Sequence, residues 1–216
     1  EKADWVWAGN ATNTAFAGQS YTVASNEQVA LTSAQGELPH LPELGRAFAM
    51  VELRNDRGLV LSIDYGTARP SAYLGRSVQL EDLQLTGLRA ESAKDEKGRS
   101  FNCPNCGSPV TVNLADSKSI TCGSCNSIID LSHGIGGELK HAEQNEPVRP
   151  LIAIGSVGQL QGAQWQVVGF QHRMGTEPGD DEHFGWSEYL LYNKKRGFSF
   201  LVDAEDGWSM VKPTTG

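Results

Sequence analysis

Cys103-Pro-Asn-Cys106 and Cys122-Gly-Ser-Cys125 are the two stretches that decide the fold of this chain. They form the pattern C-x2-C-x15-C-x2-C, and they use all four cysteines of the sequence. Each Cys-x-x-Cys places two thiolates on one tight turn, and two such turns joined by a hairpin complete a tetrahedron of sulfur around zinc. The pattern predicts a rubredoxin-like zinc ribbon over 101–133, with one Zn²⁺ bound by Cys103, Cys106, Cys122 and Cys125.

The residues that follow each cysteine pair support this prediction. Gly107 and Asn126 tolerate positive φ, which lets main-chain N–H groups bend back toward the sulfurs. Four thiolates leave zinc no open position, so the metal is predicted to be structural. Two disulfides are the alternative in an oxidising compartment. His133 and His141 are candidates for a ligand exchange, but with four cysteines in place we interpret them as ordinary loop histidines.

Composition limits the class of protein. The chain has 216 residues, of which 39% are hydrophobic, and no apolar run is long enough to cross a bilayer. Its formal charge of −8 does not attract nucleic acid or anionic lipid by bulk charge. The chain starts at Glu1 without an initiating Met or a signal peptide, so we expect an excerpt of a longer protein. Reduced, metal-binding cysteines favour a cytoplasmic location.

The residues before the ribbon are rich in strand signals. Residues 46–54 and 58–65 are short apolar-rich runs, and Asn55-Asp-Arg-Gly58 between them is a good hairpin loop. Residues 19–25 and 29–32 predict a second pair of strands. We therefore expect a β-rich unit over 1–90, followed by a linker over 91–100, where charge is mixed and almost nothing is apolar.

The residues after the ribbon predict a second β unit. Residues 134–150 are rich in Gly and charge and are interpreted as another linker. Five short strands with turn signals between them then fill 151–213, which suggests a small antiparallel barrel of the SH3-like kind. The predicted fold class is mainly β, with two small β-barrel or SH3-like units flanking the ribbon.

Two segments of the chain resemble each other. Ala17-Gly-Gln-Ser-Tyr-Thr-Val23 and Gln161-Gly-Ala-Gln-Trp-Gln-Val167 both place an aromatic residue three positions after glycine and a valine two further. Both could be the opening hairpin of one β unit that is used twice. Chance similarity between β-hairpins is the interpretation that we favour.

Several elements resemble a known family. They are the ribbon stretches Phe101–Val110 and Cys122–Asp130, together with the later elements Ile154-Gly-Ser-Val-Gly158, Val168-Gly-Phe170, Trp186-Ser-Glu-Tyr-Leu190 and Gly207-Trp208. In these elements the chain is similar to the bacterial domain of unknown function 4178, as the C-terminal portion of a longer member. The resemblance implies a bacterial, intracellular protein, and genes of this family often lie near those for band-7 (SPFH) membrane scaffold proteins and polyamine-synthase-like enzymes. The partner is not identified by this resemblance; a membrane-associated scaffold protein is one candidate, which would place the chain at the periphery of the membrane. The resemblance implies no established activity.

The last β unit carries the remaining candidate site residues. Alternation over 186–192 puts Trp186, Glu188 and Leu190 on one face, and Tyr189 and Leu191 on the other. Glu188 is then a carboxylate beside indole rings. It either hydrogen-bonds a Trp N–H within the core or recognises a cationic ligand in an aromatic pocket. The candidate ligand or partner surface consists of Trp186, Glu188, Tyr189 and Trp208.

Three functions are compatible with these features. The favoured one is a non-catalytic zinc-ribbon scaffold or adaptor that mediates protein–protein contacts in a membrane-associated bacterial stress system. The second is a small-ligand-binding or enzymatic barrel that uses Glu188 and its aromatic neighbours. The third, nucleic-acid binding through the ribbon, is disfavoured, because the ribbon carries only one basic residue, Lys118, and one aromatic residue, Phe101.

Overall fold

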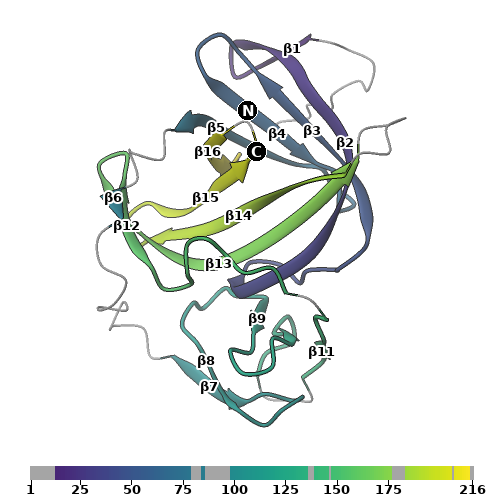
Figure 1. Cartoon of the computed structure of the whole chain (residues 1–216). Coiled ribbons are helices and arrows are strands. Elements are labelled where there is room, and N and C mark those ends of the chain that lie inside the picture. Colours follow the sequence, from purple (N-terminus) through teal and green to yellow (C-terminus); the bar gives the residue numbers. More distant parts are fainter. Residues whose placement is uncertain are drawn as a thin grey trace.

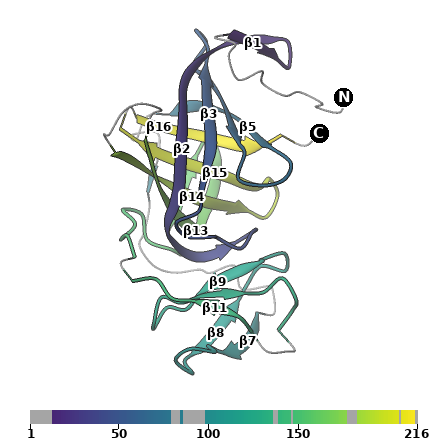
Figure 2. The ribbon, with the colours of Figure 1, turned by 90° about the vertical axis from the view of Figure 1, so that its right-hand side faces the viewer.

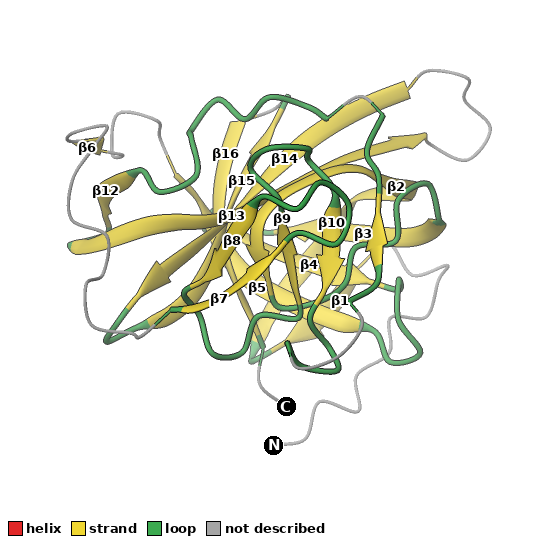
Figure 3. Ribbon diagram, turned by 90° about the horizontal axis from the view of Figure 1, so that it is seen from below, coloured by secondary structure: helices red, strands yellow, loops and turns green. Residues whose placement is uncertain are grey.

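The computed structural model describes residues 13–78, 84–85, 98–135, 139–145, 147–176, 183–205 and 207–214. All regular secondary structure within these ranges is β-strand, so the predicted mainly β class is confirmed (Figure 3). The described residues accordingly contain no helix long and apolar enough to cross a membrane.

Eight strands close into one antiparallel barrel (Figure 1). They are β2 (Gln19–Leu38), β3 (Ala47–Arg54), β4 (Leu59–Asp64), β5 (Ser71–Val78), β13 (Ala163–Thr176), β14 (His183–Asn193), β15 (Gly197–Ala204) and β16 (Gly207–Pro213). The order around the barrel is β2-β3-β4-β5-β16-β15-β14-β13, and β13 pairs back with β2. The two β units that the sequence predicts therefore share one barrel, to which each contributes a four-stranded meander.

Each meander begins with a matching hairpin. β1 (Asn13–Phe16) pairs with β2, and β12 (Val157–Leu160) pairs with β13. The turn residues Ala17 and Gly18 have φ of 47° and 72°, and Gln161 and Gly162 have φ of 50° and 69°. Positive φ at both central positions is the signature of a type I′ turn. The two similar sequence segments are thus equivalent hairpins, and the five strands predicted for 151–213 correspond to β12–β16.

Glycines lie at both junctions where the meanders meet. Gly36 of β2 pairs with Gly169 of β13, and a Cβ built on Gly36 would lie 2.3 Å from the carbonyl oxygen of Val168. At the other junction, a Cβ on Gly75 of β5 would lie 1.9 Å from the carbonyl oxygen of Met210 in β16. The missing side chains therefore let the two meanders approach closely enough to close the barrel.

One predicted element differs from the structure. The sequence pattern predicts two strands over 19–25 and 29–32, but both segments belong to the single 20-residue strand β2. Its first part pairs with β3 and its second part with β13, so the chain changes partner without a turn. Register shifts between Val23 and Ser25, against β3, and beside Arg173, against β13, accommodate the bend.

The ribbon lies at one end of the barrel (Figure 2). It contains β7 (Arg99–Asn102), β8 (Pro109–Val112), β9 (Ser119–Thr121), β10 (Ile128–Asp130) and β11 (His141–Ala142). β7 and β8 form their own sheet, whereas β9 pairs with the end of β2 through Glu37 and Leu38. The ribbon and the barrel are thus joined by main-chain hydrogen bonds as well as by the chain connection.

Parts of the two predicted linkers form strands. Arg99 and Ser100 already belong to β7, while 91–97 lie outside the described residues. In the second predicted linker, His141 and Ala142 form β11, and Gln144 is buried between the ribbon and the barrel. The main-chain groups of β7 and β11 form hydrogen bonds with β8 and β10, whereas those of a solvated linker would bond to water.

Side chains of the barrel strands separate onto two faces. In β3, Val51 and Leu53 belong to a buried apolar cluster with Tyr21 and Leu61, whereas Met50 and Glu52 face a cavity inside the barrel. A second apolar cluster, which contains Trp165, Phe170, Tyr189 and Leu201, packs against the C-terminal meander. These two clusters therefore occupy the face of each meander that is turned away from the cavity, whereas a third cluster, with Leu190, Phe200 and Val211, extends to the cavity wall.

Candidate functional site

The barrel contains a cavity of about 1220 Å³, which we call the lumen. All eight barrel strands contribute side chains to its wall. Every second side chain of a strand faces the lumen, because successive side chains of a strand point to opposite faces. Many of these inward side chains are polar. These inward positions include Glu52 in β3, Ser62 and Asp64 in β4, Gln171 and Arg173 in β13, and Trp186 and Glu188 in β14.

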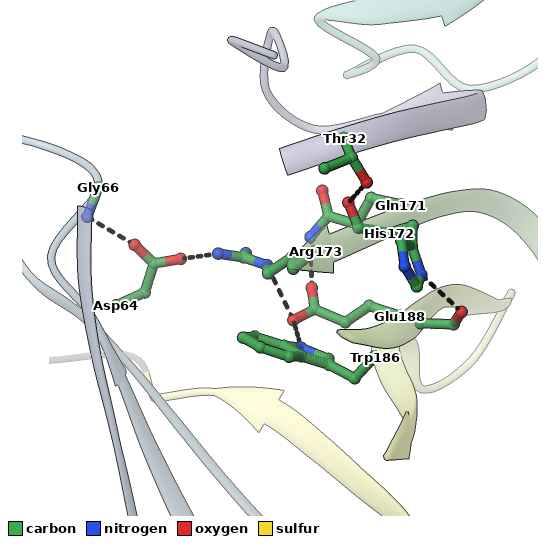
Figure 4. Close-up of polar contacts among 9 residues, drawn as sticks. Thr32, Asp64, Gly66, Gln171, His172, Arg173, Trp186 and Glu188 are labelled. Atoms are coloured by element: carbon green, nitrogen blue, oxygen red, sulfur yellow. Dashed lines mark hydrogen bonds and ion pairs between the residues drawn. The ribbon is translucent and has the colours of Figure 1, made fainter. Parts of the chain in front are cut away.

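A buried network of charged groups crosses the lumen and centres on Arg173 (Figure 4). Arg173 Nη1 donates to Asp64 Oδ2 at 3.0 Å, and its Nε lies 3.0 Å from Glu188 Oε1. That second contact is an ion pair without the alignment of a hydrogen bond. Asp64 Oδ1 also accepts from the main-chain N–H of Gly66 at 2.7 Å. The contact with Asp64 ties the two meanders together, and the two carboxylates beside the guanidinium compensate the cost of burying these charges.

Glu188 has two further partners. Trp186 Nε1 donates to Glu188 Oε1 at 2.9 Å, and Gln171 Nε2 donates to Glu188 Oε2. A hydrogen bond from a Trp N–H was one of the two roles that the sequence left open for Glu188, and the structure contains this bond. It also faces the lumen, so the contact with Trp186 does not remove it from the cavity wall.

The network affects the protonation of its neighbours. Burial lowers the pKa of Arg173, but the charges of Glu188 and Asp64 outweigh burial and raise it, so the guanidinium stays protonated. Burial and the same two carboxylates raise the pKa of Tyr73 to about 12. Burial and the charge of Arg173 lower the pKa of His40, against the opposing effect of Glu188 and Asp64. His40 is therefore neutral at pH 7.

The segment 39–46, between β2 and β3, forms part of the lumen wall. Gly45 N donates to Leu31 O at 2.8 Å, which folds this segment back across β2. The ribbon holds its start, because Ser119 Oγ donates to His40 O at 2.7 Å and Lys118 N donates to Leu38 O at 2.9 Å. The position of His40 in the lumen thus depends on the ribbon.

The four cysteines converge in the ribbon. Their sulfur atoms all lie within 4.8 Å of one another, and both the Cys103–Cys125 and the Cys106–Cys122 pairs are 3.7 Å apart. Metal–sulfur bonds of about 2.3 Å give a tetrahedron edge of about 3.8 Å. A disulfide needs about 2.0 Å, and all four cysteines are free thiols. The cluster could therefore hold a metal ion, and neither His133 nor His141 belongs to it.

The turns around the cysteines have the predicted positive φ. Gly107 and Asn126 have φ of 74° and 59°. Each donates its N–H to the carbonyl of the first cysteine of its pair, Cys103 or Cys122, at 2.9 Å. These bonds close the turns that bring each pair of sulfurs to one side.

Two polar side chains fasten the ribbon to the barrel. Glu37 of β2 accepts four hydrogen bonds from the ribbon, from Asn113 N, Asn113 Nδ2, Leu114 N and Ser117 Oγ. Gln144 bonds Ala34 N and O on β2 and the carbonyl of Asn126 in the second cysteine turn. Both side chains are buried, so the ribbon and the barrel share a specific polar interface.

The structure divides the candidate surface that the sequence suggested. Trp186 and Glu188 lie together in the lumen wall. Tyr189 lies on the opposite face of β14, where its hydroxyl accepts from Leu151 N at 3.1 Å and its ring stacks on that of Trp208, 6.1 Å away. Tyr189 and Trp208 therefore anchor the segment before β12 and are not part of the same site as Glu188.

Sequence reasoning missed the partners of Glu188. The period of two is the signal that could have identified them, because it places Gln171 and Arg173 on one face of β13, although Gln164, Gln166 and His172 make other positions of this strand polar as well. Asp64 ends a strand that carries no comparable signal. Its pairing with Arg173 requires knowledge of how the barrel closes.

Comparison with known proteins concerns the C-terminal meander. No curated protein and no solved structure matched the chain. Residues 153–216 match the family model described as domain of unknown function (DUF4178). The matched segment covers β12–β16, with Trp186 and Glu188, but not Asp64 or the ribbon. The predicted resemblance is thus confirmed for the C-terminal part of this chain, which is a match to domain of unknown function (DUF4178).

Proposed function

We propose that the lumen binds a small organic ligand and that the four cysteines hold one structural Zn²⁺. The observation that carries the first part is a cavity of about 1220 Å³ that contains the Asp64–Arg173–Glu188 network. Small-molecule sites are concave, with a few placed polar groups and volumes of about 300–1000 Å³. Eight-stranded barrels have interiors wide enough to hold one small ligand.

The position of the network supports binding over a purely structural role. Ion pairs that only stabilise a fold gain little over apolar packing, because desolvation offsets their attraction. Here the paired groups line an open volume, in which a ligand would meet Glu188, Trp186 and Gln171.

The donor set supports zinc. Thiolates are soft ligands that select zinc or iron–sulfur centres, and the 3.7 Å separations between sulfurs fit a tetrahedron around one zinc ion. Cys103, Cys106, Cys122 and Cys125 would complete its coordination and leave no position for substrate. Such thiolates persist in a reducing compartment, so we propose a cytoplasmic location.

An adaptor role is the second candidate, and exposed apolar side chains before β12 favour it. Leu151 is 75% exposed and Ile154 is 37% exposed, in the segment that Tyr189 anchors. A protein partner could bury them, and we propose a membrane-associated scaffold protein of a bacterial stress system as that partner. This role and ligand binding use different faces of β14, so the two are compatible.

The ligand hypothesis can be tested by filling the lumen. Ala204 is half-buried at the end of β15 and lines the cavity, so Ala204→Trp should obstruct it. Ala153 is exposed and outside the cavity wall, so Ala153→Trp is the matched control. Each protein is incubated with a small-molecule extract of host cells, washed, and analysed by native mass spectrometry.

We expect the wild-type and Ala153→Trp proteins to retain the same small molecule and the Ala204→Trp protein to lack it. Unliganded mass in all three proteins, or retention by folded Ala204→Trp, would contradict ligand binding in the lumen.

A further inference from the structure

The charge balance of the lumen wall restricts the ligand. Among the described residues, six carboxylates line the cavity, those of Glu27, Glu43, Glu52, Asp64, Glu188 and Glu205, but only two guanidinium groups do. Both guanidiniums are already paired, because Arg46 lies 2.7 Å from Glu43 and Arg173 contacts two carboxylates. Arg54 lies outside the wall but pairs with Glu52. With Arg54 included, three guanidinium groups stand against six carboxylates, so the carboxylates remain in excess.

Two imidazoles, those of His40 and His183, also line the cavity, and they are too few to restore neutrality. Burial and the charge of Arg173 lower the pKa of His40, which leaves this group uncharged at neutral pH. A cavity lined by an excess of one sign of charge attracts ligands of the opposite sign, so this wall repels carboxylates and phosphates.

Gln171 provides a second observation, which concerns hydrogen bonding. Its side chain is 1% exposed, and its Nε2 donates to Glu188 Oε2. A carboxylate only accepts, so this bond fixes which end of the amide is the oxygen. Gln171 Oε1 is then buried without a hydrogen-bond donor in the part of the chain that the structure describes. The ring of His40 lies near enough for Gln171 to raise its pKa, but no hydrogen bond to Oε1 is formed.

A buried acceptor without a partner costs free energy that a ligand with an N–H group would recover. Gln171 and Glu188 are adjacent in the lumen wall, so one donor group can contact both. Aromatic faces complete the environment, since the rings of Phe184 and Trp186 stack 5.9 Å apart beside Glu188 and also line the lumen. Ring faces attract cations.

We propose that the ligand is a protonated amine whose ammonium group binds between Gln171 Oε1 and the carboxylate of Glu188. This assignment rests on the proposed ligand-binding function. A quaternary ammonium would satisfy the charge and the rings, but it has no N–H for Gln171. A primary ammonium offers three donors.

Four probes of one chain length separate these properties. Pentylammonium carries charge and N–H donors, pentyltrimethylammonium carries charge alone, pentanol is neutral, and pentanoate is an anion. Each is titrated by calorimetry at pH 7.5 into the full zinc-loaded chain. We expect pentylammonium to bind roughly tenfold more tightly than the quaternary and neutral probes, as for one lost charge-assisted hydrogen bond, and pentanoate to give no signal.

Variants locate the binding. Glu188→Gln keeps the shape but removes the charge, and should weaken pentylammonium binding roughly tenfold. Phe184→Leu removes one of the two stacked rings at a less buried wall position and should weaken binding severalfold, which keeps the test valid if Glu188→Gln fails to fold. Glu143→Gln is the control, because Glu143 is exposed and outside the lumen wall.

The outcomes distinguish the two proposals. Tighter binding of pentanol or pentanoate would overturn the charge assignment while leaving ligand binding intact. Equal binding of the primary and quaternary probes would overturn the role of Gln171. If no probe binds, and no small molecule is retained in the mass-spectrometry experiment, the proposed function itself fails.

Discussion

Replacing Glu37 by Gln tests the interface between the ribbon and the barrel. The two carboxylate oxygens accept at 2.8 and 3.2 Å from Asn113, at 2.9 Å from Leu114 N and at 2.7 Å from Ser117 Oγ. Glu37 is 6% exposed, so water cannot easily replace these bonds. A glutamine has the same shape, but one of its two terminal atoms is a donor.

The expected loss follows from this arrangement. Glu37→Gln replaces one of the two acceptor oxygens by an NH₂ group, so the ribbon donors on that side face another donor. Hydrogen bonds to charged groups contribute about 1.5–3 kcal/mol each, and a buried donor left unpaired costs about 1–3 kcal/mol. The Ser117 hydroxyl can rotate to accept, which limits the loss. We therefore expect Glu37→Gln to reduce the free energy of unfolding by about 3 kcal/mol, a large part of the typical total of about 5–15 kcal/mol.

Urea denaturation of the zinc-loaded proteins measures this loss, with Glu143→Gln as an exposed control. A chelator that competes for zinc gives an independent signal. It should remove the metal faster from Glu37→Gln, because Asn113, Leu114 and Ser117 belong to the loop between the cysteine pairs. A loss below about 0.5 kcal/mol, as for an ordinary surface substitution, together with unchanged zinc release, would refute the argument that Glu37 fastens the ribbon.

Three further perturbations address the metal cluster, the barrel junction and His40. Cys106→Ser should abolish zinc binding and unfold the ribbon, because metal binding and folding are coupled there; metal analysis and hydrogen exchange check this, and a zinc-loaded variant would contradict it. Gly75→Ala should lower stability by about 3 kcal/mol or more, since its Cβ would lie 1.9 Å from Met210 O, and Gly123→Ala, with no atom within 4 Å, should fold normally; equal thermal midpoints would argue against close approach at that junction. The lowered pKa of His40 means that the unfolded chain binds the proton more readily below the ordinary value of 6.5. Wild-type stability should therefore fall as pH falls from about 7 to about 5, and His40→Gln should reduce that slope; identical slopes would contradict the burial of a neutral His40.

Local sequence determined the ribbon and the alternation of the last meander. The cysteine spacing, with Gly107 and Asn126 after each pair, specifies two turns through contacts between residues only a few positions apart. The period of two in a strand likewise suffices to place Trp186 and Glu188 on one face and Tyr189 on the other. Both inferences depend on covalent geometry, which acts over short distances along the chain.

Only the tertiary structure decided that the two meanders form one barrel with a lumen. The pairing of β2 with β13 and of β5 with β16 uses main-chain hydrogen bonds, which are the same for every sequence and so leave no motif to identify the partner strand. Asp64 and Arg173 are separated by 109 residues, and they meet only after both junctions have closed. The lumen and its charge network are therefore properties of long-range strand pairing, which the local pattern of residues does not encode.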